Sequence, residues 1–140
     1  ANEDGFTLIE LLVVIVIIGV LAAVVAPRFL GRTEQGNIAA ARSQIANLSI
    51  ALDNYQLDTG YYPSSRQGLL ALFEKPSGSP KPRDWRGPYL KATEVPLDPW
   101  STPYVYVSPG KINTQWYDLM SYGKDGKEGG SGDDADITNR

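Results

Sequence analysis

The sequence predicts an α+β fold in which one long N-terminal helix packs on a small antiparallel β-sheet. The first half of the predicted helix is apolar on every side, and its second half carries a continuous apolar stripe. Two short segments with the alternating pattern of strands follow in the last third of the chain. The 140 residues are enough for one small domain in addition to the apolar helix.

The apolar part of the helix contains no charged side chain between Leu11 and Ala26. Counted from Phe6, it has about 21 residues, which at about 1.5 Å rise each span the hydrocarbon core of a bilayer. Glu10 places one carboxylate inside this segment. An ionisable side chain at that depth is costly, so it predicts a functional role and a cationic partner.

A cleaved secretory signal peptide is one alternative for this stretch. However, the run is longer than a typical signal, no basic residues precede it, and the helical pattern continues beyond it. A plain single-span anchor is the stronger alternative, and Glu10 argues against it. Gly19 adds backbone freedom and Pro27 removes a hydrogen bond, so the sequence leaves the segment between them straight, kinked or unwound.

Past Pro27 the pattern becomes that of an amphipathic helix, which we expect to end near Gly60. Glycine supplies a C-terminal stop, and Pro63 prevents continuation. The apolar stripe recurs at spacings of three and four and consists of Ile38, Ala41, Ile45, Leu48, Leu52 and Tyr55. The rest of the chain must bury this stripe.

The remaining residues form short elements and loops. Residues 65–74 carry a short helical pattern, and the proline-rich stretch 75–88 predicts an irregular surface loop. The segments 103–107 and 116–122 alternate like strands, and Ser108-Pro-Gly110 turns the chain between them, which predicts an antiparallel hairpin. Because most aromatic residues lie after residue 54, we expect a core with aromatic rather than aliphatic filling.

Composition excludes several classes of function. Without cysteine the chain has neither a disulfide framework nor a thiolate metal site. Without histidine it also lacks the commonest general base and the usual zinc or iron ligand. The formal net charge of −3, with no basic cluster, gives no electrostatic footprint for nucleic acid. The composition therefore excludes most familiar hydrolytic machinery; an enzyme that uses carboxylates alone remains open, although no motif in the sequence points to one.

The C-terminal stretch combines carboxylates with glycines. The acidic residues are Asp125, Glu128, Asp133, Asp134 and Asp136. Calcium prefers about six to eight oxygen ligands on a chain that can wrap around the ion, although the spacing here is not that of an EF-hand. A solvated acidic tail is the alternative. The apolar Ile137 and the need of a small domain for a staple favour calcium, but the residues alone leave both open.

These motifs together resemble a known family. Gly5-Phe-Thr-Leu-Ile-Glu10 before an apolar helix resembles the class III signal peptide of type IV pilins and pseudopilins. Further motifs resemble the major pseudopilin of type II secretion systems, in the family's order from residue 5 to residue 137. They are Leu52-Asp-Asn-Tyr-Gln-Leu-Asp58, Tyr62-Pro63 with Gln67-Gly68-Leu69, Leu97-Asp-Pro-Trp100 with Pro103-Tyr104, Ser108-Pro-Gly110, Asp125-Gly-Lys-Glu-Gly-Gly130 and Asp134-Ala-Asp-Ile137.

The resemblance implies a type IV pilin-like fold in three parts. These are a leader peptide at residues 1–5, a transmembrane and filament-core helix at residues 6–29, and a periplasmic globular domain at residues 30–140. It also implies that a prepilin peptidase cleaves between Gly5 and Phe6 and methylates the new amino terminus.

The same resemblance assigns roles to individual residues. Glu10 would pair with the Phe6 amine of a neighbouring subunit in the filament, and the helix would unwind between Gly19 and Pro27 on assembly. A calcium ion would bind the C-terminal loop. Its ligands would be the side chains of Asp125, Asp134 and Asp136 and backbone carbonyls near Tyr122 and Lys127, with Asp133 as an alternative.

The implied function is that of a subunit of a periplasmic filament that pushes folded proteins through an outer-membrane channel. Expected partners are further copies of the chain, minor pseudopilins, the inner-membrane platform and the prepilin peptidase, and no nucleic acid. Before assembly the subunit would span the bacterial inner membrane once, with its globular domain in the periplasm.

Three features depart from the family's pattern. Residues 1–4 are acidic where the family carries Lys or Arg, which together with Arg28 and Arg32 opposes the orientation that the positive-inside rule predicts. Ser101 occupies the position of a family glycine, and Thr138-Asn-Arg140 replaces a terminal Gly-Asn-Trp.

Two other functions remain as alternatives. A type IV pilin of a motility or adhesion filament typically closes its C-terminal region with a disulfide, and the absence of cysteine argues against it. A singly anchored calcium-binding module would not need Glu10.

Overall fold

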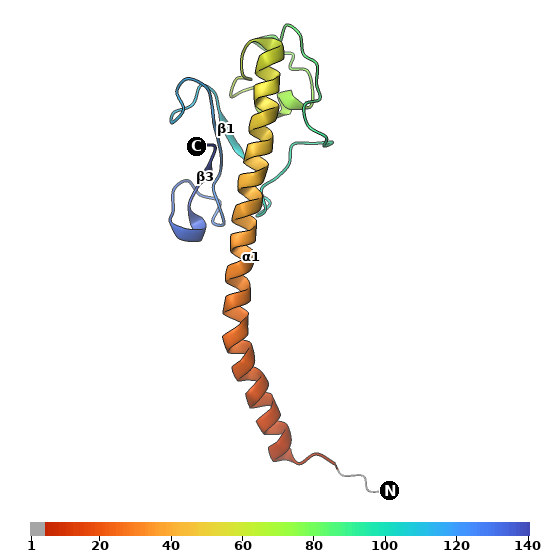
Figure 1. Cartoon of the computed structure of the whole chain (residues 1–140), viewed down its shortest axis with the longest axis vertical. Helices are drawn as coiled ribbons and strands as arrows, with labels where there is room; N and C mark the ends of the chain where they lie inside the picture. Colours follow the sequence, from red (N-terminus) through yellow and green to blue (C-terminus); the bar gives the residue numbers. More distant parts are fainter. Residues whose placement is uncertain (1–4) are drawn as a thin grey trace. The chain divides into compact units, whose positions relative to one another are not determined.

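The computed structural model describes residues 5–140, apart from the side chains of Pro27, Phe29 and Leu30. Residues 1–4 of the expected leader lie outside this range. The elements in chain order are α1 (Leu8–Thr59), η1 (Leu69–Leu72), β1 (Val105–Val107), β2 (Asp118–Ser121), η2 (Gly132–Asp134) and β3 (Ile137–Thr138), as Figure 1 shows. Contacts divide the chain into two compact units, the first ending at Gly36 and the second comprising Asn37–Arg140.

Helix α1 is one uninterrupted helix of 52 residues, as the periodicity predicts. It begins after Thr7, whose hydroxyl accepts a hydrogen bond from the backbone N–H of Glu10 at 3.2 Å. It ends where Gly60 adopts a φ of 91° and donates its N–H to the Gln56 carbonyl at 2.8 Å, which is the predicted glycine stop. The segment from Gly19 to Pro27 is helical throughout.

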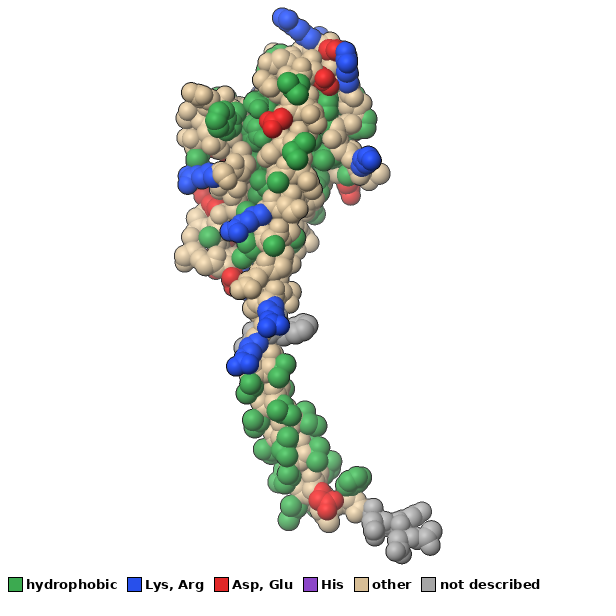
Figure 2. Space-filling model, viewed as in Figure 1, with side chains coloured by type: hydrophobic (Ala, Val, Ile, Leu, Met, Phe, Trp, Pro, Cys, Tyr) green, Lys and Arg blue, Asp and Glu red, His purple; other side chains and the backbone are tan. Residues whose placement is uncertain are grey.

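The first unit exposes its apolar side chains. Every residue from Gly5 to Ala26 is exposed. Figure 2 shows that hydrophobic side chains cover the first part of the helix, with an acidic side chain close to its N-terminal end. Within the described residues, α1 is long and apolar enough to cross a membrane, with a mean hydropathy of 3.2 over its most apolar 18 residues. None of that window is buried.

The second unit is built on the apolar stripe of α1. Ala41, Ile45, Leu48, Leu52 and Tyr55 are each at most 3% exposed, whereas Ile38 is partly buried. Three later elements, η1, β2 and β3, add buried residues to this core. These residues are Leu69, Ala71 and Leu72 of η1, Leu119 of β2 and Ile137 of β3. The stripe is therefore covered by side chains from segments distant in sequence.

The expectation of an aromatic core was wrong. Among the described buried hydrophobic residues, only Tyr55, Tyr104 and Tyr117 are aromatic. Several further rings lie partly buried against this aliphatic centre; they are Tyr62, Phe73, Trp85, Tyr89, Trp100 and Tyr106. An indole or a phenol is placed there because its polar end needs a hydrogen-bond partner. Trp85 donates its Nε1–H to the Ala71 carbonyl at 2.9 Å, and the Tyr106 hydroxyl donates to the Pro63 carbonyl at 2.7 Å.

The sheet has three antiparallel strands in the order β1-β2-β3. The predicted hairpin is confirmed in shortened form, with Val105 opposite Met120 and Val107 opposite Asp118. Strand β3, whose Ile137 pairs with Ser121, is not among the predicted elements, because a two-residue strand has no readable alternation. The helical pattern at residues 65–74 corresponds to the short 3₁₀ helix η1.

The carboxylate of Asp118 holds the loop between β1 and β2. It is 2% exposed and accepts backbone N–H groups of Lys111, Ile112 and Asn113 at 2.7, 2.9 and 2.8 Å and the Asn113 amide at 3.1 Å. Burial acts to raise the pKa of Asp118, but these hydrogen bonds outweigh it and hold the pKa below its ordinary value. The Cβ of any side chain at Gly110 would lie 2.6 Å from this carboxylate.

A second buried carboxylate, Asp98, organises the turn before β1. It is 4% exposed and accepts the N–H groups of Trp100 at 3.1 Å and Thr102 at 2.8 Å, and the Ser121 hydroxyl at 2.7 Å. This turn forces Ser101 to a φ of 62°, a left-handed conformation that L side chains disfavour. A glycine, which the resemblance implies at this position, would adopt this backbone conformation without strain.

Replacing Ser101 with glycine should stabilise the protein. Relief of the left-handed strain outweighs the larger chain entropy of glycine, so we expect a gain of about 1 kcal/mol in the free energy of unfolding. Urea unfolding of the full chain in detergent, followed by tryptophan fluorescence, measures it. Ser77→Gly in an exposed loop is the matched control and should give no gain; equal effects of both variants would contradict the strain.

Asp118 should make stability depend on pH in the acid range. A carboxyl whose folded pKa lies below its unfolded value, about 3.9, stabilises the fold above that value, and this stabilisation is lost as the pH falls through the folded pKa. Asp118→Asn should cost about 2 kcal/mol at neutral pH, because its amide cannot accept all of these N–H groups. It should also flatten the decline in unfolding free energy below about pH 4. Glu74→Gln is the control. If the unfolding free energy of Asp118→Asn declines in acid as steeply as that of Glu74→Gln, this role of Asp118 is contradicted.

Candidate functional site

Glu10 lies in the first turn of α1 and is exposed. Thr7 and Glu10 have the spacing of a capping box. The structure shows one hydrogen bond of this motif, in which the backbone N–H of Glu10 donates to the Thr7 hydroxyl. The capping-box spacing can be read from the sequence, although it is not among the predicted features of this stretch. A carboxylate is also favoured at a helix N-terminus by the helix dipole. Local helix physics therefore accounts for an acidic residue at this end of the helix without a cationic partner.

Gly5 and Phe6 precede α1 in irregular backbone. Both residues are exposed, and Phe6 is 90% exposed. The peptide bond between them therefore lies outside the helix and is sterically open in the isolated chain.

The predicted calcium ligands all lie in the connection between β2 and β3. Asp125 accepts the Lys127 N–H at 3.1 Å through Oδ1, and Asp136 accepts the Gly129 N–H at 2.9 Å through Oδ2. Asp133 and Asp134 lie in η2. The structure places these residues in one loop but does not gather their carboxylates: residues 5–140 contain no group of three or more acidic, histidine or cysteine side chains arranged to hold a metal.

One oxygen in this loop is unpaired. Oδ1 of Asp136 is buried and has no hydrogen-bond partner among the described residues. A buried carboxylate oxygen without a partner carries an uncompensated desolvation cost, which a cation or a water molecule would offset.

The two halves of the loop approach each other backbone to backbone. Gly130 has a φ of 90°, and a Cβ there would lie 2.5 Å from the Asp134 carbonyl oxygen. Gly123 has a φ of 74°, and its Cβ would lie 2.8 Å from the Ala135 carbonyl oxygen. Glycine is thus required at both positions, and carbonyl oxygens of one half face the other half at short range.

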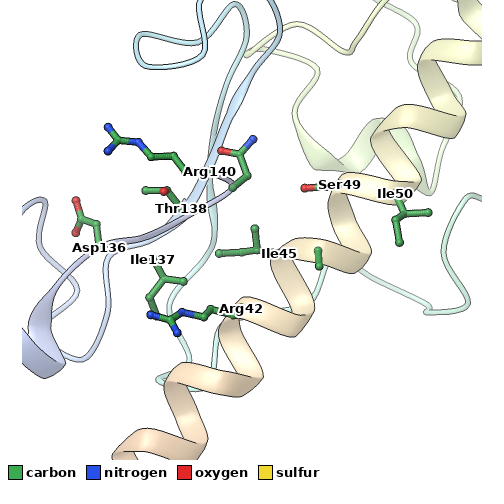
Figure 3. A pocket seen from close by; sticks show the side chains of 10 residues that line it. Arg42, Ile45, Ser49, Ile50, Asp136, Ile137, Thr138 and Arg140 are labelled. Atoms are coloured by element: carbon green, nitrogen blue, oxygen red, sulfur yellow. The ribbon is translucent and has the colours of Figure 1, made fainter.

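A groove of about 660 Å³ lies between α1 and β3. Figure 3 shows this groove from close by. We refer to it as the α1–β3 groove. It is lined by Arg42, Ile45, Ala46, Ser49 and Ile50 of α1 and by Asp136, Ile137, Thr138, Asn139 and Arg140. No sequence signal predicts this groove, because it depends on where β3 lies.

Comparison with known proteins identifies the family. Residues 28–140 match the family model described as type II secretion system (T2SS), protein G, and residues 1–26 match the prokaryotic N-terminal methylation motif. The chain is 49% identical to the type II secretion system core protein G of Pseudomonas aeruginosa, over 99% of this chain and 95% of the relative. It is 46% identical to the protein of that name in Vibrio cholerae, over 99% and 92%.

A solved structure agrees with this grouping. The crystal structure of the major pseudopilin from the type 2 secretion system of enterohaemorrhagic Escherichia coli has a TM-score of 0.65 and 34% sequence identity, covering 79% of this chain and 91% of that chain. Together with the long helix and small antiparallel sheet described above, these matches show that the chain belongs to the protein G family of type II secretion systems.

Proposed function

We propose that the chain is a structural subunit, without catalytic activity, that polymerises through its N-terminal helix into the periplasmic pseudopilus of a type II secretion system. This filament drives export of folded proteins across the outer membrane. The observation that carries the proposal is the apolar part of α1: from Leu8 to Ala26 every residue is exposed, almost all are apolar, and one carboxylate, Glu10, lies near the start of the helix.

Such a helix has two environments that suit it. In the bacterial inner membrane it spans the lipid once, with the globular unit in the periplasm; in the filament it packs against the same helix of other copies. Because lipid tails are as apolar as these side chains, the second state is stabilised by close packing between helices and by pairing of polar groups, and not by removal of apolar surface from water. The minor pseudopilins, the inner-membrane platform and the prepilin peptidase are the partners that this cycle requires.

Glu10 is the assembly residue in this proposal. Removal of residues 1–5 by the peptidase creates a Phe6 amine, which is then methylated, and this amine of one copy pairs with Glu10 of the next. Pairing two desolvated charges costs far less than leaving one alone. Gly19 and Pro27 bound the part of α1 that unwinds as the copies pack.

Calcium is proposed as the ligand of the loop between β2 and β3. The loop offers an oxygen-rich donor set of the kind that calcium prefers. It consists of the unpaired Oδ1 of Asp136, the carboxylates of Asp125 and Asp134, with Asp133 as the alternative, and backbone carbonyls near Tyr122 and Lys127. The ion supplies positive charge that draws these carboxylates together. Because β3 follows directly, an ordered loop fixes this strand on the sheet.

Removing the charge of Glu10 should prevent assembly. Glu10→Gln keeps a side chain that serves a capping box but removes the partner of the Phe6 amine, so we expect at least about a tenfold loss of filaments and of secretion. Electron microscopy of sheared filaments and a secretion assay measure both. Thr7→Ala weakens the cap, keeps the carboxylate, and should assemble; filaments of Glu10→Gln at the level of the unmodified chain would refute the role.

Calcium removal should destabilise the globular unit. With EGTA in place of calcium, we expect the melting temperature of the full chain in detergent to fall by about 5 °C or more, which corresponds to about 1 kcal/mol. Asp136→Asn should lose most of this response, and Glu74→Gln should keep it. A melting temperature that is the same with calcium and with EGTA would rule out the site.

A further inference from the structure

The α1–β3 groove combines an apolar floor with a charged lining of two arginines and one carboxylate, that of Asp136 near β3. Ile45 is 3% and Ile137 is 6% exposed at its floor, whereas Ile50 remains 60% exposed on its α1 side. Arg42 and Arg140 line the groove as well, and neither has an ion-pair partner among the described residues. Figure 3 shows the Arg42 side chain extending near Ile137. An occupant that suits this groove is an apolar side chain accompanied by a carboxylate.

The chain itself carries such a segment, Glu94–Leu97. Glu94 is exposed, and Leu97 is 52% exposed although it is a large aliphatic residue. Neighbouring residues Ala92 and Pro96 line a small cavity with Gln44 and Asn47 of α1. At about 100° of rotation per residue, Gln44 and Asn47 lie about 140° to 160° around α1 from Arg42 and Ser49 of the groove. Ile50 lies at the groove's other edge, about 60° from Asn47. Segment and groove therefore occupy different flanks of the same helix.

Leu97 is held rigidly in its exposed position. Its backbone forms an antiparallel bridge with Pro103, and the next residue donates its N–H to the Thr102 carbonyl at 2.9 Å. That next residue is the buried Asp98, whose carboxylate fixes the turn below. A contact made by a side chain on such a support loses little conformational entropy on binding.

We infer that Glu94–Leu97 of one copy docks into the α1–β3 groove of the next copy. The side chain of Leu97 covers Ile50 and the apolar floor, and Glu94 faces Arg42. This inference rests on the proposed function, since it names the contact by which the globular units follow one another. Because the two surfaces differ and lie on different flanks, the contact is heterologous and repeats in an open series, as a filament requires.

Cysteine cross-linking tests this contact directly, because the chain has no cysteine of its own. Full-length Leu97→Cys/Ile50→Cys, assembled into filaments and treated with a short bismaleimide, should give a ladder of dimers, trimers and larger species. Leu70→Cys/Ile50→Cys is the matched control, since Leu70 is 51% exposed and lies outside both surfaces; it should give no ladder. Normal filaments without a ladder from the first pair, or with equal ladders from both pairs, would overturn the inference while leaving the proposed function intact.

A charge exchange provides the second measurement. Glu94→Arg should lower filament yield about tenfold, or about 1.4 kcal/mol per contact, and Glu94→Arg/Arg42→Glu should restore both the yield and the cross-link. Glu74→Arg, an equally exposed carboxylate elsewhere, should have no effect. Failure of the double variant to recover overturns the pairing of Glu94 with Arg42. If the unmodified chain forms no filaments, the proposed function fails and the inference fails with it.

Discussion

Burial of one face of α1 is the interaction on which the globular unit depends. The other elements are too short to be stable alone: the strands have two to four residues, and η1 and η2 are single turns. η1, β2 and β3 each add buried side chains to the core that the apolar stripe of α1 begins, and Tyr106 of β1 packs partly buried against it. A two- or three-stranded sheet of this size is marginal in water without a packed partner, and the helix is that partner.

Buried carboxylates perform the work that disulfides or a larger sheet would do elsewhere. Asp118 and Asp98 have no cation beside them among their hydrogen-bond partners; each accepts neighbouring backbone N–H groups and thereby fixes a turn. Asp136 is satisfied only on one oxygen, which distinguishes it from these two. Asp118 and Asp98 therefore have both carboxylate oxygens hydrogen-bonded within the fold, whereas one buried oxygen of Asp136 has no partner among the described residues.

The sequence predicted the elements that have a period or a distinct stop, and little else. The extent of α1, its end at Gly60 and the β1–β2 hairpin all follow from patterns longer than three residues. Strand β3, the α1–β3 groove and the aliphatic composition of the core could not be predicted, because they depend on contacts between segments far apart in the chain. The residues expected to bind calcium lie in one loop but are not gathered into a cluster, and their spacing in the sequence could not show that Oδ1 of Asp136 is buried without a partner among the described residues. The strain at Ser101 could not be predicted either. The sequence shows that a serine stands where the family pattern has glycine, but only the backbone angle φ shows that this serine is strained.

The shortness of the sheet also has a consequence for solubility. Its two outer strands, β1 and β3, have three and two residues, so each offers only a few free backbone groups to a neighbouring chain. Long, flat edges recruit other edges and lead to disordered aggregates, and natural proteins avoid this with very short edge strands. A protein that must reach high local concentration beside many identical copies is thereby protected from uncontrolled sheet-to-sheet association, and ordered contacts are left to its helix and side chains.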